Sequence, residues 1–484
     1  MREIRIIDQT IRDSHQSLWA TRMSAAMMLP IADKLDRAGF ECIDVPIGGV
    51  HVDVCVRYLK ENPWERLKQL HQRIRRTPTY GTIRNRSGTS FDVIAEDLPM
   101  LWVERLIANG IRRFRMYDAL FDQDIIIRQL RYAKELGAYT VGALAYGLSP
   151  VHTDALYAEK AKELIDKAGV DAIMLKDAAG LLTPDRIRTL VPALLAVCGK
   201  RPLELHSHCI TGLAPLVYLD AVELGVNQIH TSIAPLANGA AQPATQTMVR
   251  NLRDRGYAVN VDDRLIDEIS EHFTKVAAQE GKPVGKPMEY DAFHFAHQVP
   301  GGMQSNFKAQ LDQVGLGNRL DDVLHECVRV REELGWPVMI TPFSQFVGTQ
   351  AVLNIVAGER YKLVPDEIKK YALGYYGRLL APVAPDVLQK IIDNGSQNIP
   401  LEAEEPEPGV PALRARFPGI SDDERLLRHS YAGNQVDEMF AAGAMKTTYE
   451  FEPPIARLLR ELAKRPRLAR VFVQRPGLLI DLRR

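Results

Sequence analysis

Residues 171–208 read DAIMLKDAAGLLTPDRIRTLVPALLAVCGKRPLELHSH, and this stretch decides the fold. Two short apolar runs, Asp171 to Asp177 and Leu203 to Cys209, enclose a segment whose apolar residues recur at helical spacing. Strand, helix and strand in this order form the repeating unit of an α/β fold with parallel strands. Each run also carries side chains suited to chemistry near its end, namely Lys176 in the first run and His206 and His208 in the second.

The same unit recurs along the first half of the chain. The expected strands are Ile4 to Gln9, Cys42 to Ile47, Thr77 to Ile83, Arg113 to Asp118, Tyr139 to Gly147, Asp171 to Asp177, Leu203 to Cys209 and Gln228 to Ile233. Eight strand–helix units over about 250 residues match the size and order of a (β/α)₈ TIM barrel. The predicted class is therefore α/β, and we expect the reactive groups at the C-terminal ends of the strands.

The strand pattern stops at about Pro283, where helical patterns such as Leu320 to Leu334 and Pro365 to Tyr375 replace it. The predicted parts are a barrel over residues 1–290, a mostly helical domain over residues 291–440 and a helical tail over residues 441–484. Residues 399–418 are rich in proline and glutamate, so we expect a loop or linker there.

Composition narrows the classes of function. Of the 484 residues, 61 are Lys or Arg and 61 are Asp or Glu, which gives a formal net charge of zero. We expect no nucleic-acid partner, because such binding needs clustered positive charge. The five cysteines form no C-x-x-C pair, which favours reduced thiols over disulfides or a zinc ribbon. Since neither an apolar leader nor a run of about 18 apolar residues occurs, we expect a cytoplasmic protein.

Three of the expected strands end in candidate metal ligands. His206 and His208 lie at i and i+2, so both imidazoles face the same side of a strand and can bind one ion. With Asp13 at the end of the first strand, they form a nitrogen and oxygen set suited to zinc, cobalt or manganese. Lys176 follows an apolar run, where a perturbed or modified lysine is expected. The alternatives are a hydrogen-bonded histidine pair, a helix N-cap at Asp13 and a salt bridge at Lys176.

Further motifs follow one another along most of the chain. They are Arg12-Asp13-Ser14-His15-Gln16-Ser17-Leu18, Asn62-Pro63-Trp64-Glu65-Arg66-Leu67, Ser149-Pro150-Val151-His152-Thr153, Leu175-Lys176-Asp177, His206-Ser207-His208, Pro300-Gly301-Gly302-Met303 and Thr341-Pro342-Phe343-Ser344-Gln345. In this order they resemble the carboxyltransferase domain of biotin-dependent enzymes, which include pyruvate carboxylase, the transcarboxylase 5S subunit and the oxaloacetate decarboxylase alpha subunit. The resemblance covers roughly residues 1–400.

The resemblance implies a site at the barrel mouth. It implies a divalent metal, Zn, Co or Mn, held by Asp13, His206, His208 and Lys176, the last as a catalytic carbamate made with carbon dioxide. Carbamylation turns a cation beside a dication into an anionic oxygen ligand, which removes a repulsion. The helical domain would be the funnel that closes over this mouth.

The resemblance also implies roles in substrate handling. Thr341 takes the place of a threonine hydroxyl that moves a proton between the substrate methyl group and the biotin ring nitrogen, a role that suits a group able to donate and accept. The alternative for Thr341 is a helix cap before Pro342. Arg12, Gln16 and Arg84 take the places of residues that hold the acid, and an arginine fork matches a carboxylate.

The implied function is carboxyl transfer between carboxybiotin and a 2-oxo acid, such as pyruvate or oxaloacetate, through an enolate. The dipeptide Met445-Lys446 is similar to a biotin attachment site, but Pro453, Pro454 and a helix-like flank argue against a biotinyl β-sandwich. We therefore expect biotin on a separate carrier protein. The expected partners are this biotin carboxyl carrier protein, biotin carboxylase or membrane decarboxylase subunits, and a second copy of the chain in a homodimer.

The sequence departs from the family pattern in the expected substrate pocket. Ile47 stands where the family has a tryptophan, and His51, Arg86 and Phe91 also differ from it. An added arginine and histidine would favour an acid that differs from pyruvate or carries more negative charge.

Two other functions compete with this one. The first is a metal-dependent aldol-type lyase or synthase, which shares the barrel and the histidine pair but uses no carbamylated lysine such as Lys176 would provide. The second is a non-catalytic scaffold that keeps the fold but has lost turnover.

Overall fold

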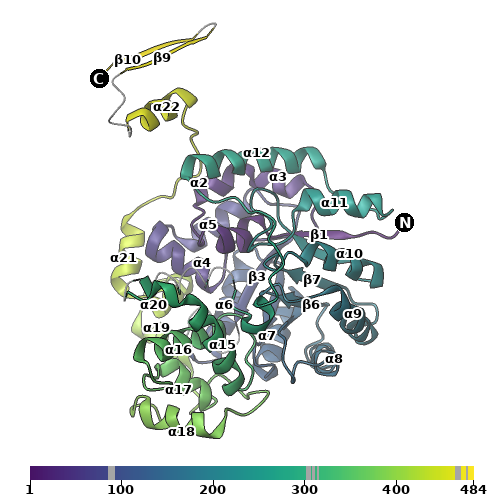
Figure 1. Ribbon diagram of the computed structural model, residues 1–484, viewed down its shortest axis with the longest axis vertical. Coiled ribbons are helices and arrows are strands. Elements are labelled where there is room, and N and C mark those ends of the chain that lie inside the picture. The colour runs from purple at the N-terminus through teal and green to yellow at the C-terminus, as the bar shows by residue number, and fades with distance from the viewer. Residues whose placement is uncertain are drawn as a thin grey trace.

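The computed structural model describes residues 1–84, 93–300, 303, 307, 311–312, 315–463, 470–475 and 478–483. Eight parallel strands close into a barrel in chain order (Figure 1). They are β1 Arg5–Asp8, β2 Cys42–Asp44, β3 Thr79–Arg84, β4 Arg113–Tyr117, β5 Tyr139–Ala145, β6 Ala172–Asp177, β7 Leu203–Ser207 and β8 Gln228–Thr231. Each predicted run overlaps one strand, so the predicted (β/α)₈ barrel is confirmed.

Register brings the chemistry of neighbouring strands together. β1 pairs with β8, with Ile6 opposite Ile229, and this pairing closes the barrel. On β6 and β7, Lys176 lies directly opposite His206. Because all eight strands are parallel, their C-terminal ends meet at one mouth of the barrel.

The helices that surround the barrel begin with recognisable caps. Pro63 and Pro184 are the first residues of two of them, and the side chains of Asn62 and Thr183 accept hydrogen bonds from backbone N–H groups of the first turn. The helices of the barrel are α1 His15–Leu18, α2 Ala25–Met28, α3 Ala32–Arg37, α4 Gly49–Val54, α5 Pro63–His71, α6 Asp97–Ala108, α7 Asp124–Glu135, α8 Asp154–Glu163, α9 Pro184–Cys198, α10 Ala214–Leu224, α11 Thr245–Asp254 and α12 Asp263–Glu280.

A helical region follows the barrel. Its helices are α13 His294–His297, α15 Leu320–Glu333, α16 Phe343–Ala357, α17 Asp366–Ala372, α18 Pro385–Asn394, α19 Gly409–Arg416, α20 Asp422–Ser430 and α21 Gly433–Ala441. Buried residues of this region, such as Val330 and Phe343, belong to the same hydrophobic cluster as the barrel strands. The two regions therefore share one continuous apolar core.

The expectation of a loop over residues 399–418 is wrong in its second half, where α19 forms. The backbone N–H groups of Gly409 and Val410 donate to the carboxylate of Asp97 on α6. Leu413 packs against Leu98 of the same helix. These tertiary contacts hold a helix in a stretch whose proline content indicates none.

The expectation of a helical tail is also wrong in part. After α22, Pro454–Ala463, the chain forms an antiparallel pair of strands, β9 Arg470–Arg475 and β10 Leu478–Arg483. β9 contains Val471, Phe472 and Val473, which favour strands, and the Pro-Gly dipeptide at 476–477 is a turn signal. Figure 1 shows this hairpin projecting away from the barrel, beyond α22.

Among the described residues, no helix combines the length and the apolar character needed to cross a bilayer.

Candidate active site at the barrel mouth

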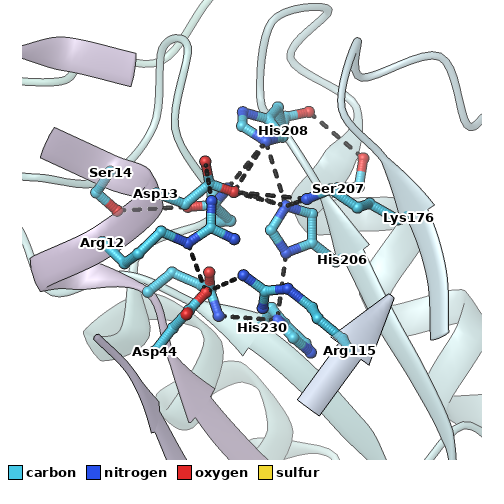
Figure 2. A network of polar contacts seen from close by, with 12 residues as sticks. Arg12, Asp13, Ser14, Asp44, Arg115, Lys176, His206, Ser207, His208 and His230 are labelled. Carbon is cyan, nitrogen blue, oxygen red and sulfur yellow. Dashed lines mark hydrogen bonds and ion pairs between the residues drawn. The ribbon is translucent and has the colours of Figure 1, made fainter. Parts of the chain in front are cut away.

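Four predicted ligands converge at the C-terminal mouth of the barrel (Figure 2). Asp13 lies in a π-helical turn, Thr10–Ser14, that directly follows β1. Lys176 and His206 lie in β6 and β7, and His208 follows β7. All four side chains are buried. The turn begins after Gln9 and has no side-chain cap, so Asp13 is not an N-cap.

The ligand atoms lie within contact distance of one another. Oδ2 of Asp13 is 3.0 Å from Nε2 of His206 and 3.5 Å from Nε2 of His208. The two Nε2 atoms are 3.2 Å apart. Within the part of the chain that the structure describes, this is the one group of three Asp, Glu, His or Cys residues whose ligand atoms lie within 4.8 Å of one another.

The donor set fits a divalent cation. Nδ1 of His208 lies 2.6 Å from the carbonyl oxygen of Ala240, which only accepts, so Nδ1 carries the proton and Nε2 presents a lone pair. Burial, aided by the positive charge of Lys176, lowers the pKa of His206 well below its ordinary value. Imidazole lone pairs and a carboxylate oxygen so close together repel one another unless a cation lies between them. This nitrogen and oxygen set suits zinc, cobalt or manganese.

Lys176 borders the same group. Its Nζ lies 3.1 Å from Nε2 of His206 and 3.8 Å from Oδ2 of Asp13, so the salt bridge with Asp13 is a long one. Burial lowers the pKa of Lys176 to about 8, although the Asp13 carboxylate opposes this shift. At pH 7 about one tenth of this amine is therefore uncharged and nucleophilic, far more than for an exposed lysine.

Arg12 braces the cluster from the β2 side. Its Nε donates to Oδ2 of Asp44 at 2.7 Å, and its NH1 lies 3.1 Å from Oδ1 of Asp13. Arg115 of β4 donates to the same Asp44 oxygen (Figure 2). Burial raises the pKa of the Asp13 carboxyl, but the charges of Arg12 and Lys176 outweigh it and hold that pKa well below its ordinary value. Sequence reasoning missed the roles of Asp44 and Arg115, although Asp44 is a carboxylate at a strand end.

Gln242 also belongs to the cluster, and sequence reasoning missed it. Its Nε2 donates to Oδ2 of Asp13 at 3.2 Å and lies 3.1 Å from Nε2 of His208. Its Oε1 accepts from the hydroxyls of Ser14 and Ser232, which fixes the amide orientation. Gln242 lies in the loop after β8, where no periodic pattern signals its position.

A cavity of about 230 Å³ opens in front of this cluster. Of the predicted site residues, those that line it are Arg12, Asp13, Gln16, Lys176, His208 and Thr341. His206 lies beneath its floor and is fully buried. The cavity therefore connects the ligand cluster with a threonine that comes from the helical region.

Thr341 lies just before α16 at the edge of this cavity. The α16 N-cap position is Pro342, and no side chain caps the helix, so Thr341 is not the helix cap of the alternative interpretation. Its carbonyl oxygen accepts from the Tyr117 hydroxyl at 3.2 Å. Its own hydroxyl lies 3.5 Å from Nε2 of Gln345. The Thr341 hydroxyl is thus held by weak contacts and remains able to donate and to accept.

The structure describes only some of the pocket residues that differ from the family pattern. Ile47 and His51 line the cavity. Burial lowers the pKa of His51 to about 3, and its Nε2 lies 3.1 Å from the Arg12 carbonyl oxygen. Burial therefore favours the neutral form of His51, and its expected contribution to binding a more anionic acid stays a prediction. Arg86 and Phe91 lie outside the described residues, as does the side chain of Arg84 at the end of β3.

Two family comparisons divide the chain as the fold does. Residues 123–272, in the second half of the barrel, match the HMGL-like family. Residues 295–417, which form most of the helical region, match the family described as the conserved carboxylase domain. The second match separates this chain from proteins that have the barrel alone.

Comparisons with whole proteins agree. The chain is 39% identical to a pyruvate carboxylase subunit of Methanocaldococcus jannaschii over 448 residues, which cover 92% of this chain and 78% of that protein. It is 34% identical to the 2-oxoglutarate carboxylase large subunit of Hydrogenobacter thermophilus over 82% of this chain and 61% of that protein. The structure of the carboxyl transferase domain from Rhizobium etli pyruvate carboxylase with pyruvate matches at 25% identity with a TM-score of 0.82, over 91% of this chain and 77% of that one.

A TIM barrel joined to a carboxylase-type helical region defines a carboxyltransferase. The chain belongs to the family of carboxyltransferase subunits of biotin-dependent carboxylases. It is therefore an enzyme of carboxyl transfer. The predicted family is confirmed, and the match of residues 295–417 to the conserved carboxylase domain favours it over the lyase alternative.

Proposed function

We propose that this protein transfers a carboxyl group between biotin on a separate carrier protein and a 2-oxo acid. The observation that carries the proposal is the cavity that joins the Asp13, His206 and His208 cluster to Thr341. One end of this cavity suits an oxygen that gains negative charge, and the other offers a hydroxyl that can move a proton.

The proposed cofactor is one divalent metal, zinc, cobalt or manganese, with Asp13, His206, His208 and a carbamate on Lys176 as its ligands. When bound, such a cation would stabilise the negative charge that develops on the enolate oxygen of the acid. Gln242 would support the Asp13 carboxylate through its amide hydrogen bond.

Carbamate formation on Lys176 would need only the neutral amine and carbon dioxide. The lone pair of the neutral amine attacks the carbon of carbon dioxide, so a nitrogen–carbon bond forms while one carbon–oxygen π pair moves onto oxygen. The nitrogen then loses a proton to water. The low pKa of about 8 makes the neutral amine available near physiological pH. The product replaces an ammonium by a carboxylate beside the two histidines, which removes the repulsion between Lys176 and a bound cation.

Thr341 is the proposed proton carrier. Its hydroxyl accepts a proton from the carbon of the acid next to the oxo group and donates it to the biotin ring nitrogen, or does the reverse in the opposite direction. The Tyr117 hydroxyl donates to the Thr341 carbonyl and so fixes the Thr341 backbone at the edge of the cavity. The Thr341 hydroxyl itself makes only a long contact with Gln345, so it stays available for proton transfer.

Arg12, Gln16 and Arg84 are the proposed binding residues for the acid. Nε of Arg12 donates to Asp44, and its Nη1 forms an ion pair with Asp13. Arg12 would therefore orient the Asp13 carboxylate as well as the substrate. The volume of about 230 Å³ is below the range of about 300–1,000 Å³ typical of pockets for drug-sized ligands, which favours a small acid. Pyruvate, oxaloacetate and 2-oxoglutarate are the acids to compare, because relatives are named for two of them.

The proposed partners are a biotin carboxyl carrier protein and either biotin carboxylase or membrane decarboxylase subunits. Lys446 lies in an irregular segment between α21 and α22, without the flanking strands of a biotin-bearing hairpin among the described residues. We further propose that the protein works in the cytoplasm as a homodimer. The five cysteines are free, as a reducing compartment would keep them.

A direct assay tests the proposal. The purified protein, loaded with zinc, cobalt or manganese, is mixed with free biotin and oxaloacetate, and release of pyruvate is followed. We expect turnover that requires biotin and falls by about 10²-fold in Thr341→Ala. We also expect a carbamate resonance in ¹³C NMR after addition of ¹³CO₂ that is lost in Lys176→Ala. Metal binding without biotin-dependent release of pyruvate from oxaloacetate would contradict the proposed reaction.

A further inference from the structure

A chain of buried polar side chains runs from the metal-ligand cluster into the interior of the barrel. Nδ1 of His206, on the side of the ring away from the cluster, lies 3.2 Å from Nδ1 of His230 on β8. Nε2 of His230 lies 3.0 Å from Oε2 of Glu204 on β7. The hydroxyl of Tyr80 on β3 donates to Oε1 of Glu204 at 2.6 Å. Figure 2 shows His230 directly below His206.

This chain of side chains departs from the usual interior of such a barrel. TIM-barrel interiors are filled mainly by Val, Ile and Leu, whereas Tyr80, Glu204, His206 and His230 are all 0% exposed here. A buried carboxylate and two buried imidazoles cost free energy unless every polar atom is paired. Both carboxylate oxygens of Glu204 accept a hydrogen bond, so both acceptor atoms are paired within this group of residues.

The acceptor role of Glu204 determines which atom donates in each hydrogen bond between these side chains. Because Glu204 accepts, the proton of His230 lies on Nε2, and its Nδ1 presents a lone pair. The amide nitrogen of Gln9, a donor, lies 3.0 Å from the same Nδ1, which agrees with this assignment. Nδ1 of His206 must then carry a proton, since two facing lone pairs would repel. The lone pair of His206 is therefore on Nε2, the atom that faces Asp13 and His208.

We propose that Glu204 and His230 are positioning residues that hold His206 in the Nδ1–H tautomer and fix the orientation of its ring. This inference rests on the proposed metal site, because its effect is to present the His206 Nε2 lone pair to a bound cation. Hydrogen bonds to the outer nitrogen of a ligating histidine orient the ring and raise its basicity. An isolated imidazole exchanges its tautomers and leaves its metal-binding nitrogen protonated for part of the time.

The test measures metal affinity as well as activity. Glu204→Gln and His230→Gln keep similar volumes while they remove the carboxylate or the second ring. We expect each to weaken the binding of Zn²⁺, measured by competition with a chromophoric chelator, by about 10- to 100-fold. The visible absorption bands of the Co²⁺-loaded protein should shift. KM for the acid should change less than kcat, because neither residue lines the cavity.

Two further variants separate positioning from general stability. Gln228→Met removes another buried polar side chain from β8, and we expect wild-type Zn²⁺ affinity and an unchanged Co²⁺ spectrum, since Gln228 has no contact with His206 among the hydrogen bonds of the described residues. Tyr80→Phe removes only the far end of the polar chain, so its loss of affinity should be the smallest of those along it. The double variant of Glu204 and His230 should lose no more affinity than the more strongly affected single variant, because both act through the same bond.

The outcomes distinguish this inference from the proposed function. If the wild-type protein binds metal and turns over an acid, but Glu204→Gln and His230→Gln keep its Zn²⁺ affinity within about twofold, the positioning role is wrong and the proposed function stands. If the wild-type protein binds neither Zn²⁺ nor Co²⁺, both fail together. If Gln228→Met weakens Zn²⁺ binding as much as His230→Gln does, the effect is a general one of the barrel core and the specific role is wrong.

Discussion

The two sides of the cavity are built in different ways. Its floor carries Asp13, Lys176 and His208 on or directly after barrel strands, so the hydrogen-bonded ladder fixes their positions. Its roof carries Thr341 from a loop of the helical region. The floor would persist wherever the barrel folds, whereas the roof depends on how the helical region docks.

The side chain of Arg331 joins the roof to the barrel. Arg331 of α15 is buried, and its Nε donates to the Pro337 carbonyl at 2.9 Å while its Nη2 donates to the Leu148 carbonyl at 2.7 Å. One guanidinium thus ties the loop that leads to Thr341 to the end of β5. Because the proposed metal ligands lie in the floor and the proposed proton carrier lies in the roof, we expect mutations to separate metal binding from proton transfer.

The largest expected change in kcat comes from a mutation in the floor of the cavity. His208→Ala removes one ligand of the proposed metal, so we expect a loss of stoichiometric Zn²⁺ and a fall in kcat of about 10³-fold or more, since a catalytic cation contributes several kcal/mol to charge stabilisation. Elemental analysis of the purified variant and the oxaloacetate assay measure both quantities. Full activity with no bound metal in His208→Ala would show that the floor does not act through a cation.

The roof gives the next largest effect. Thr341→Ala removes the proton carrier and leaves the floor intact, so we expect kcat to fall by about 10²-fold while Zn²⁺ content stays at the wild-type level. Thr341→Ser keeps a hydroxyl and serves as the matched control, with most of the activity retained. If Thr341→Ala also lost its metal, the two regions would not be independent.

The tie between the regions should give a smaller effect on catalysis. Arg331→Met leaves the Pro337 carbonyl with no donor among the described residues and the Leu148 carbonyl with only the amide of Gln298, so we expect the free energy of unfolding to fall by about 1 to 3 kcal/mol. A displaced Thr341 should lower kcat by about tenfold with metal content unchanged. Urea unfolding and steady-state kinetics measure these changes.

A matched control for Arg331 lies in α17. Lys369 is equally buried and donates to the carbonyls of Ile392 and Ser396, away from the cavity. Lys369→Met should lose a similar amount of stability and keep wild-type kcat. An equal loss of kcat in both variants would contradict the role of Arg331 in placing Thr341.

The smallest expected effect is at the C-terminus. A chain that stops after Pro453 lacks α22, β9 and β10 but keeps Tyr449, whose hydroxyl donates to Glu280 on α12. We expect kcat with free biotin to stay within about twofold of the full chain, since a projecting hairpin contributes little to the core. A larger loss with the carrier protein than with free biotin would assign the hairpin to partner binding.

Much of the fold is predictable because its signals are local. Each barrel strand appears as a short apolar run, and each intervening helix as a periodic segment, so the order of elements follows from the sequence. The tail hairpin is not predicted because a few helix-favouring residues in α22 outweigh the Pro-Gly turn signal. The helix α19 is not predicted because its stability comes from contacts of Gly409 and Leu413 with α6, which no local pattern contains.

The site divides in the same way. Sequence alone determined that Lys176, His206 and His208 stand at strand ends, since side chains alternate along a strand and parallel strands end at one mouth. Only the tertiary structure decided that Gln242 enters the ligand cluster and that Glu204 supports His206 through His230. Those contacts join residues from different strands and loops, and their distances depend on strand register and barrel closure, which no spacing within one segment can specify.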